Sequence, residues 1–219
     1  MNLQSHKRVL IMTAVQAERD AALRGLKGDK RFDVFLAGVG PAAAAANTAR
    51  ILATAEYDLA VSAGIGGGFP GRAEIGSLVV ANEIVAADLG AETPEGFMSL
   101  DELGFGFTRV QVDLCLVNRL TEALLAANLP VSTAPVLTVS TVTGTAVRAA
   151  EMAARVPGGA AEAMEGYGVA IAAQDCGVPV LEIRSISNLV GPRDRSAWRI
   201  KEALEALEAA SSVFLEVSL

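Results

Sequence analysis

Residues 58–71, DLAVSAGIGGGFPG, join an apolar run to four glycines within five positions. Residues 59–62 have the continuous apolar pattern of a strand that is buried on both faces. From Gly64 on, the glycines allow the backbone to bend and to approach another group closely. In open α/β sheets, ligands bind in the crevice outside the carboxyl ends of the strands. This stretch therefore predicts a central strand, residues 59–62, followed by a glycine-rich turn at a ligand site, although a glycine-rich bend without a ligand explains it equally well.

Two segments match the glycine spacing of dinucleotide-binding loops. Residues 66–71 fit G-x-G-x-x-G, but Pro70 interrupts the match, and residues 75–87 have the pattern of a strand instead of the required helix. Residues 38–43 fit G-x-G-x-x-A between a predicted strand and an alanine-rich helix, without a well-placed acidic partner. Close helix packing through small residues explains this second match, and we favour that interpretation.

The length and composition predict one soluble domain. A chain of 219 residues can bury a large core, and we expect a single domain over residues 1–219. No stretch has the length and apolar character of a membrane span, and the start, MNLQSHKR, is too polar for a signal peptide. We therefore expect a cytoplasmic protein that binds no membrane. The net charge of −7 without a basic stripe argues against nucleic acid as a partner.

Few residues are available for nucleophilic or metal chemistry. Cys115 and Cys176 are widely separated within apolar helical patterns, which predicts buried, reduced thiols. His6 is the only histidine and lies near the terminus. A Ser-His-Asp triad or a histidine-rich metal site is therefore excluded, and acid and base chemistry falls to carboxylates.

Predicted strands and helices alternate along the whole chain. This alternation predicts an α/β fold with a central mixed, mostly parallel twisted sheet between helices. The predicted strands are residues 8–13, 32–39, 59–62, 78–87, 131–141, 161–164 and 178–187, and the predicted helices are 17–26, 41–55, 113–127, 145–155, 165–176 and 196–216.

Residues 88–106 are predicted to be a long loop. Loops of this length inside a compact domain are usually functional or disordered. Phe97, Phe105 and Phe107 are concentrated in and just after this segment, so it could close over an apolar group, but packing in a satellite cluster is the favoured interpretation.

Three polar residues follow predicted strands. Glu18 follows the first strand, Glu165 follows residues 161–164, and Asn188 follows the last strand. A single acid in the first turn of a helix usually complements the helix dipole. Three polar residues at equivalent junctions instead predict one site in the same crevice as the glycines.

Five segments resemble the nucleoside phosphorylase and nucleosidase superfamily, in an order and spacing that cover essentially the whole chain. They are residues 13–18 (TAVQAE), 37–40 (AGVG), 64–69 (GIGGGF), 163–166 (AMEG) and 184–188 (RSISN). Within the superfamily, the chain is most similar to the futalosine hydrolase family, which acts in the alternative route to menaquinone. The resemblance implies hydrolysis of the N-glycosidic bond of futalosine, with release of hypoxanthine and dehypoxanthine futalosine.

The resemblance also implies that no metal or organic cofactor is needed and that the protein is a homodimer or a larger homo-oligomer. Two enzymatic alternatives remain open, a methylthioadenosine/adenosylhomocysteine-type nucleosidase and a purine nucleoside phosphorylase. A non-catalytic nucleoside-binding module is the alternative from another class. Release of free purine from nucleosides separates the enzymes from the binding module.

The resemblance assigns roles to residues by position. Glu18 corresponds to the carboxylate that activates the attacking water, and Arg184 to the basic residue that helps to hold this water. Met164 and Glu165 correspond to the pair that binds the ribose, and Asn188 to the residue that recognises the base.

Further positions are implied for the base and for the nucleophile. Gly144 and Thr145 fall where backbone groups line the purine pocket. Ile65, beside Gly66, stands where similar proteins place a serine that helps to hold phosphate. The absence of that hydroxyl predicts that water, not phosphate, attacks.

The 5′ side of the nucleoside needs its own recognition, because futalosine carries a carboxybenzoyl group there. Phe97, Phe105 and Phe107 with Arg109 would supply apolar rings and a cation for an aromatic carboxylate. Arg72 could serve equally well as the cation.

Overall fold

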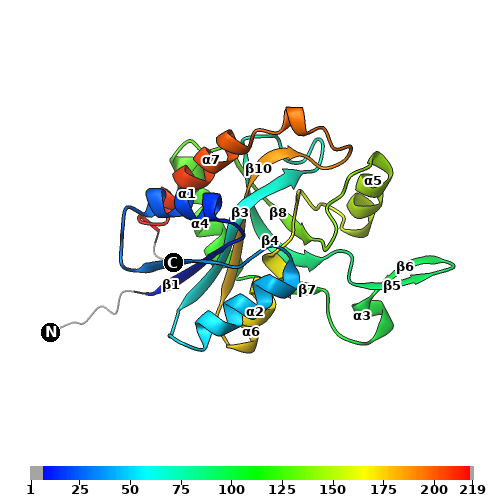
Figure 1. Ribbon diagram of the computed structural model, residues 1–219, viewed down its shortest axis with the longest axis horizontal. Coiled ribbons are helices and arrows are strands. Elements are labelled where there is room, and N and C mark those ends of the chain that lie inside the picture. The colour runs from blue at the N-terminus through cyan, green and yellow to red at the C-terminus, as the bar shows by residue number, and fades with distance from the viewer. Residues whose placement is uncertain (1–6, 218–219) are drawn as a thin grey trace.

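The computed structural model describes residues 7–217, so that His6 lies outside the described residues. Figure 1 shows a central sheet with helices on both sides and a hairpin that projects from the body. The strands are β1 (Val9–Thr13), β2 (Phe32–Leu36), β3 (Leu59–Gly68), β4 (Leu78–Ala86), β5 (Gly90–Thr93), β6 (Gly96–Ser99), β7 (Arg109–Gln111), β8 (Val131–Thr138), β9 (Ala161–Ala163) and β10 (Val180–Leu189). The helices are α1 (Gln16–Leu26), α2 (Pro41–Leu52), α3 (Leu100–Leu103), α4 (Leu114–Ala126), α5 (Ala146–Arg155), α6 (Gly166–Asp175), the 3₁₀ helix η1 (Arg195–Ala197) and α7 (Ile200–Val213).

The main sheet is mixed and mostly parallel, which confirms the predicted fold class. Its strand order is β10-β4-β8-β9-β3-β1-β2, and β7 pairs with β4. β3 pairs in parallel with both β1 and β10, and antiparallel with β9. Because β10 also pairs with β4, the sheet closes on itself, a feature that the sequence did not predict.

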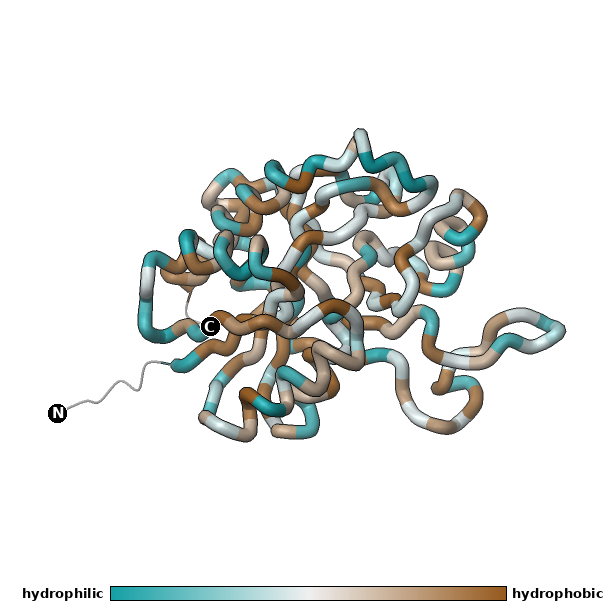
Figure 2. Tube along the Cα trace, viewed as in Figure 1, coloured by the Kyte–Doolittle hydropathy of each residue, from teal (hydrophilic) through white to brown (hydrophobic). Residues whose placement is uncertain are grey.

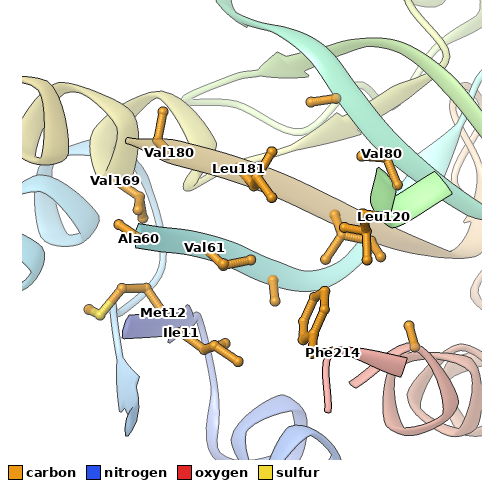
Figure 3. Packing of buried hydrophobic residues seen from close by; sticks show 14 of the residues in the cluster. Ile11, Met12, Ala60, Val61, Val80, Leu120, Val169, Val180, Leu181 and Phe214 are labelled. Atoms are coloured by element: carbon orange, nitrogen blue, oxygen red, sulfur yellow. The ribbon is translucent and has the colours of Figure 1, made fainter. Parts of the chain in front are cut away.

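The core lies on both faces of β3. Ala60 and Val61 lie between Met12 of β1 and Leu181 of β10 in Figure 3. Helix α1 packs beside α7, and α2 packs beside α6, so that helices cover both sides of the sheet. Figure 2 shows the apolar segments gathered at the centre of the molecule and polar residues along its outer turns. Within residues 7–217, no helix combines the length and the apolar character needed to cross a bilayer.

The glycines of residues 64–68 belong to β3 and do not form the predicted turn. They are needed because neighbouring groups come too close for a side chain. A Cβ atom at Gly66 would lie 2.9 Å from the carbonyl oxygen of Glu162, and one at Gly68 would lie 2.2 Å from that of Ala73. The glycines therefore let the strand pass through a crowded region, and the prediction of a strand ending at residue 62 was wrong.

Residues 88–106 contain a hairpin and a short helix, so the prediction of a loop was wrong. Strands β5 and β6 pair antiparallel and project from the body, and α3 follows them. The predicted packing in a satellite cluster fails for Phe105, of which 81% is exposed, and for Phe107, of which 46% is exposed. Phe97 is half-buried, and the centre of its ring lies 3.7 Å from the guanidinium carbon of Arg155.

Other local predictions also need correction. Cys115 and Cys176 are exposed, because Cys115 lies in the first turn of α4 and Cys176 ends α6. The last strand continues to Leu189, so Asn188 lies inside β10 and not after it. The final helix, α7, begins at Ile200 after a separate 3₁₀ turn.

Two glycines form the turn before α2, and α2 packs closely against a glycine of α6. Gly38 and Gly40 have φ values of 80° and 91°, which residues with a side chain rarely adopt. Helix α2 starts at Pro41, and a Cβ atom at Gly168 of α6 would lie 2.2 Å from the carbonyl oxygen of Pro41. This close contact supports the packing interpretation of residues 38–43.

Replacing Gly168 should therefore destabilise the fold. In Gly168→Ala, the new methyl group would have to push α2 and α6 apart, and such overpacking costs about 1–3 kcal/mol, more than the helix propensity gained. Gly106→Ala is the matched control, because the nearest atom there is Leu100 Cδ1 at 3.8 Å. Denaturant unfolding of both variants tests this, and equal stability of the two would contradict the packing argument.

Candidate active site

A cavity of about 640 Å³ opens at the carboxyl ends of β1, β3 and β10. The predicted residues Glu18, Ile65, Gly66, Met164, Glu165 and Asn188 all line it. Residues that the sequence analysis did not single out also line it, among them Thr143, Glu162, Ser187, Arg195 and Trp198. The prediction that strand ends and glycines meet in one crevice is therefore confirmed.

Glu18 lies in the first turn of α1 and is almost completely buried, with 3% of its surface exposed. Its Oε2 accepts hydrogen bonds from the backbone N–H groups of Ala14, at 2.8 Å, and Val15, at 3.1 Å. Its Oε1 accepts one from Ile65 N–H at 2.9 Å. Burial raises the pKa of Glu18, and these hydrogen bonds and the charge of Arg184 offset only part of that rise.

Arg184 holds a buried network behind this cavity. Its Nε donates to Glu182 Oε1 at 2.8 Å, its Nη1 to Glu165 Oε2 at 3.2 Å, and its Nη2 to Ser62 Oγ at 2.8 Å. Only 1% of Arg184 is exposed, and it does not line the cavity. The structure thus places the guanidinium behind the carboxylates and away from the space that a substrate would occupy.

Gly64 makes room for the contact between Glu18 and this network. A Cβ atom at Gly64 would lie 2.7 Å from Glu18 Oε1 and 2.8 Å from Arg184 Nη1. Both charged groups therefore occupy the space that a side chain would fill. This explains why the strand carries glycine at this position.

Glu182 is the completely buried partner of Arg184, and the sequence analysis missed it. Burial raises the pKa of Glu182, and among the described residues its Oε2 has no hydrogen-bond partner. Glu182 and Arg184 are two positions apart on a mostly buried strand, so they share one face of β10. Charged residues with this spacing in a buried strand were the signal that could have revealed the pair.

Asn188 reaches the cavity from an irregular point of β10. The register between β10 and β3 shifts between Ile186 and Asn188, and such bulges re-aim a side chain. Ser187 Oγ donates to Asn188 Oδ1 at 2.8 Å, and Asn188 Nδ2 donates to the carbonyl oxygen of Leu189 at 3.0 Å. One N–H of the amide and one lone pair of Oδ1 remain for a ligand.

Glu162 lines the same cavity and was also missed. Its Oε1 accepts from Thr143 N–H at 2.9 Å, and its Oε2 bonds to the hydroxyl of Thr143. Burial raises the pKa of Glu162. Gly144 and Thr145 follow this contact but do not line the cavity, and Thr145 instead caps α5 by accepting from Arg148 N–H.

Glu165 lines the cavity and also bonds to the N-terminal end of α2. Its Oε1 accepts from Gly40 N–H at 3.4 Å, while its Oε2 faces Arg184. Met164, the residue before it, is half-buried at the cavity surface. The structure thus brings together the pair that the resemblance places at the ribose.

The residues predicted to bind a 5′ aromatic carboxylate do not line the cavity of Glu18. Phe97 and Arg109 line a separate cavity of about 440 Å³, and Arg109 Nη1 is 2.5 Å from Glu83 Oε2. Neither Phe105 nor Phe107 lines the cavity of Glu18. Arg72 donates to the carbonyl oxygen of Gly159 at 2.8 Å and lines another pocket. Within residues 7–217, no group of His, Cys, Asp and Glu side chains is arranged to hold a metal ion.

Comparison with known proteins gives the family. Residues 13–218 match the family model described as the phosphorylase superfamily. The futalosine hydrolase of Streptomyces coelicolor is 51% identical over 92% of this chain and 92% of its own length. The futalosine hydrolase of Acidothermus cellulolyticus is 47% identical over 92% of this chain and 87% of its own length.

The fold has close relatives among solved structures. The 5′-methylthioadenosine/S-adenosylhomocysteine nucleosidase of Neisseria meningitidis, solved in complex with methylthio-immucillin-A, aligns with a TM-score of 0.82. The alignment covers 96% of this chain and all of that one, at 17% identity. With the matched model and the two curated relatives, the chain belongs to the phosphorylase superfamily and, within it, to the futalosine hydrolase family.

Proposed function

We propose that this protein, as one nucleosidase domain, hydrolyses the N-glycosidic bond of futalosine and releases hypoxanthine and dehypoxanthine futalosine. The observation that carries the proposal is the buried Glu18 carboxylate, which lies close to Arg184 and lines a cavity of about 640 Å³. The choice of futalosine as the substrate rests on the 51% identity to a futalosine hydrolase. A binding module would need no buried base beside the sugar site.

The residue types suit the chemistry of this bond. Its cleavage passes through a state with positive charge on the ribose, which nearby carboxylates stabilise. Glu18 is the proposed base that takes a proton from the attacking water, and its raised pKa brings its basicity closer to neutral pH. Met164 and Glu165 would bind the ribose.

Arg184 is a positioning residue in this proposal. Each of its three nitrogens donates to a protein partner, and the buried side chain does not line the cavity. It instead fixes Glu165 and compensates part of the charge of Glu18. This modifies the role that the resemblance implied.

Water is the proposed nucleophile. A phosphate ion would need hydrogen-bond donors near Ile65, but Ile65 N–H already donates to Glu18. Glu162 and Glu165 line the cavity together with Glu18, and their negative charge disfavours an anionic nucleophile beside Glu18.

Hydrolysis should therefore be independent of phosphate. The expected result is the same rate of hypoxanthine release from futalosine in phosphate-free buffer and in phosphate buffer of equal ionic strength. A rate that rises in proportion to phosphate, with a sugar 1-phosphate as product, would show that the protein is a phosphorylase.

Glu18→Gln tests the base. The variant keeps the shape of the side chain but cannot accept a proton, so kcat should fall by roughly 10²-fold or more with little change in KM. Glu202→Gln removes the acid from the first turn of α7 and is the matched control, which should keep normal kinetics. A near-normal kcat in Glu18→Gln would contradict the role of Glu18 as the base and leave it only the role of complementing the dipole of α1.

Asn188 is proposed to recognise a 6-oxopurine. Its free N–H can donate to the 6-oxo oxygen while Oδ1 accepts from the protonated N7. The amino group of adenine would face a donor instead. Such a mismatch of buried polar groups supports discrimination of about 10⁴-fold.

Futalosine should be cleaved, whereas its 6-amino counterpart, methylthioadenosine and adenosylhomocysteine should not. Asn188→Asp should shift the preference toward the 6-amino form, and Asn128→Asp on an exposed turn is the control. The measurement is kcat/KM for the 6-oxo and 6-amino forms of one nucleoside. Similar values for both in the wild type would exclude Asn188 as the residue that reads the base.

We also propose that the protein acts in the cytoplasm as a homodimer or larger homo-oligomer. The projecting β5–β6 hairpin and the exposed Phe105 and Phe107 support the oligomer, because exposed aromatic rings commonly mark protein interfaces.

A further inference from the structure

Arg195 and Trp198 present a cation and an aromatic ring to the cavity of Glu18. Both belong to the segment between β10 and α7, where Arg195 begins η1 and Trp198 follows it. The guanidinium carbon of Arg195 lies 5.7 Å from the centre of the Trp198 ring, and that of Arg193 lies 5.2 Å from it. Both distances allow cation–π attraction, which places positive charge beside the ring.

Arg195 is the one cationic side chain among the described residues that line this cavity. In residues 7–217 it forms no ion pair, whereas Arg199 lies 3.7 Å from Glu202 and Arg109 is paired with Glu83. An unpaired guanidinium can form two parallel hydrogen bonds to a carboxylate.

We propose that Arg195 and Trp198 form a subsite for an aromatic carboxylate, the class to which the carboxybenzoyl group of futalosine belongs. This inference rests on the proposed function. The benzene ring stacks on Trp198, and the carboxylate pairs with Arg195. Placed at the 5′ end of the nucleoside, the subsite distinguishes futalosine from nucleosides without an acidic 5′ group.

The separate cavity of Phe97 and Arg109 is less suited to this group within one chain. Glu83 already pairs with Arg109 there, so this guanidinium is not free for a carboxylate as Arg195 is. Arg109 therefore serves as a control cation for the test.

Kinetics with futalosine and its methyl ester test the ion pair between Arg195 and the substrate carboxylate, because the ester differs from futalosine only in lacking this negative charge. Arg195→Gln should raise KM for futalosine by about 10- to 100-fold and leave that for the ester unchanged. Arg199→Gln and Arg109→Gln should change neither. Equal effects of Arg195→Gln on both compounds, or a selective loss in Arg109→Gln instead, would overturn the assignment.

A binding measurement gives a readout without turnover. Trp198 is the only tryptophan of the chain, so the intrinsic tryptophan fluorescence reports on the subsite directly. Dehypoxanthine futalosine keeps the carboxybenzoyl group and has no bond left to cleave. Its titration should give a saturable fluorescence change in the wild type and in Arg199→Gln, and a much weaker affinity in Arg195→Gln.

The two readouts separate the subsite from the proposed function. If the wild type releases no hypoxanthine from futalosine, the proposed function fails, while the titration still measures the subsite. If hypoxanthine is released but the fluorescence does not respond, or responds equally in Arg195→Gln, the subsite is wrong and the proposed function stands.

Discussion

One buried guanidinium, that of Arg184, organises the site. It bonds directly to Glu182 and Glu165 and shares with Glu18 the space left open by Gly64. Three buried carboxylates around one cation leave excess negative charge, and buried charge is costly unless it is paired. Burial raises the pKa of Glu18 and of Glu182, and the charge of Arg184 offsets only part of each rise. The same charge that repels an anionic nucleophile stabilises a positively charged ribose.

The fold serves this network by bringing strand ends together. β3 lies between β1 and β10, so Glu18 after β1, the glycines of β3 and Arg184 of β10 meet without long loops. The antiparallel pairing of β9 adds Glu162 from the other side of β3. Asn188 and Glu162 thus line one cavity together with Glu18 and Glu165.

The sequence predicted the parallel core and six of the residues that line the cavity, because buried strands and the residues at their ends leave local signals. It did not predict the closure of the sheet or Glu182, since both depend on which strands pair. Glycines after an apolar run favour a turn in sequence terms, and the crowding of the β3 glycines by Glu18, Glu162 and Ala73 arises only from the tertiary structure. Arg195 lies in a polar connection without periodicity, so its place in the cavity depends on how residues 190–199 cross the end of the sheet.

The pH dependence of kcat for futalosine tests the central claim most directly, namely that a buried Glu18 acts as the base. Because burial raises its pKa, kcat should fall on the acid side with a midpoint above the ordinary Glu value of about 4.3. A raised carboxyl pKa favours the folded state at lower pH and less as pH rises through it, so titration of Glu18 would not itself unfold the protein in acid. A kcat that stays constant down to the ordinary carboxylate range, in protein that remains folded, would contradict the claim.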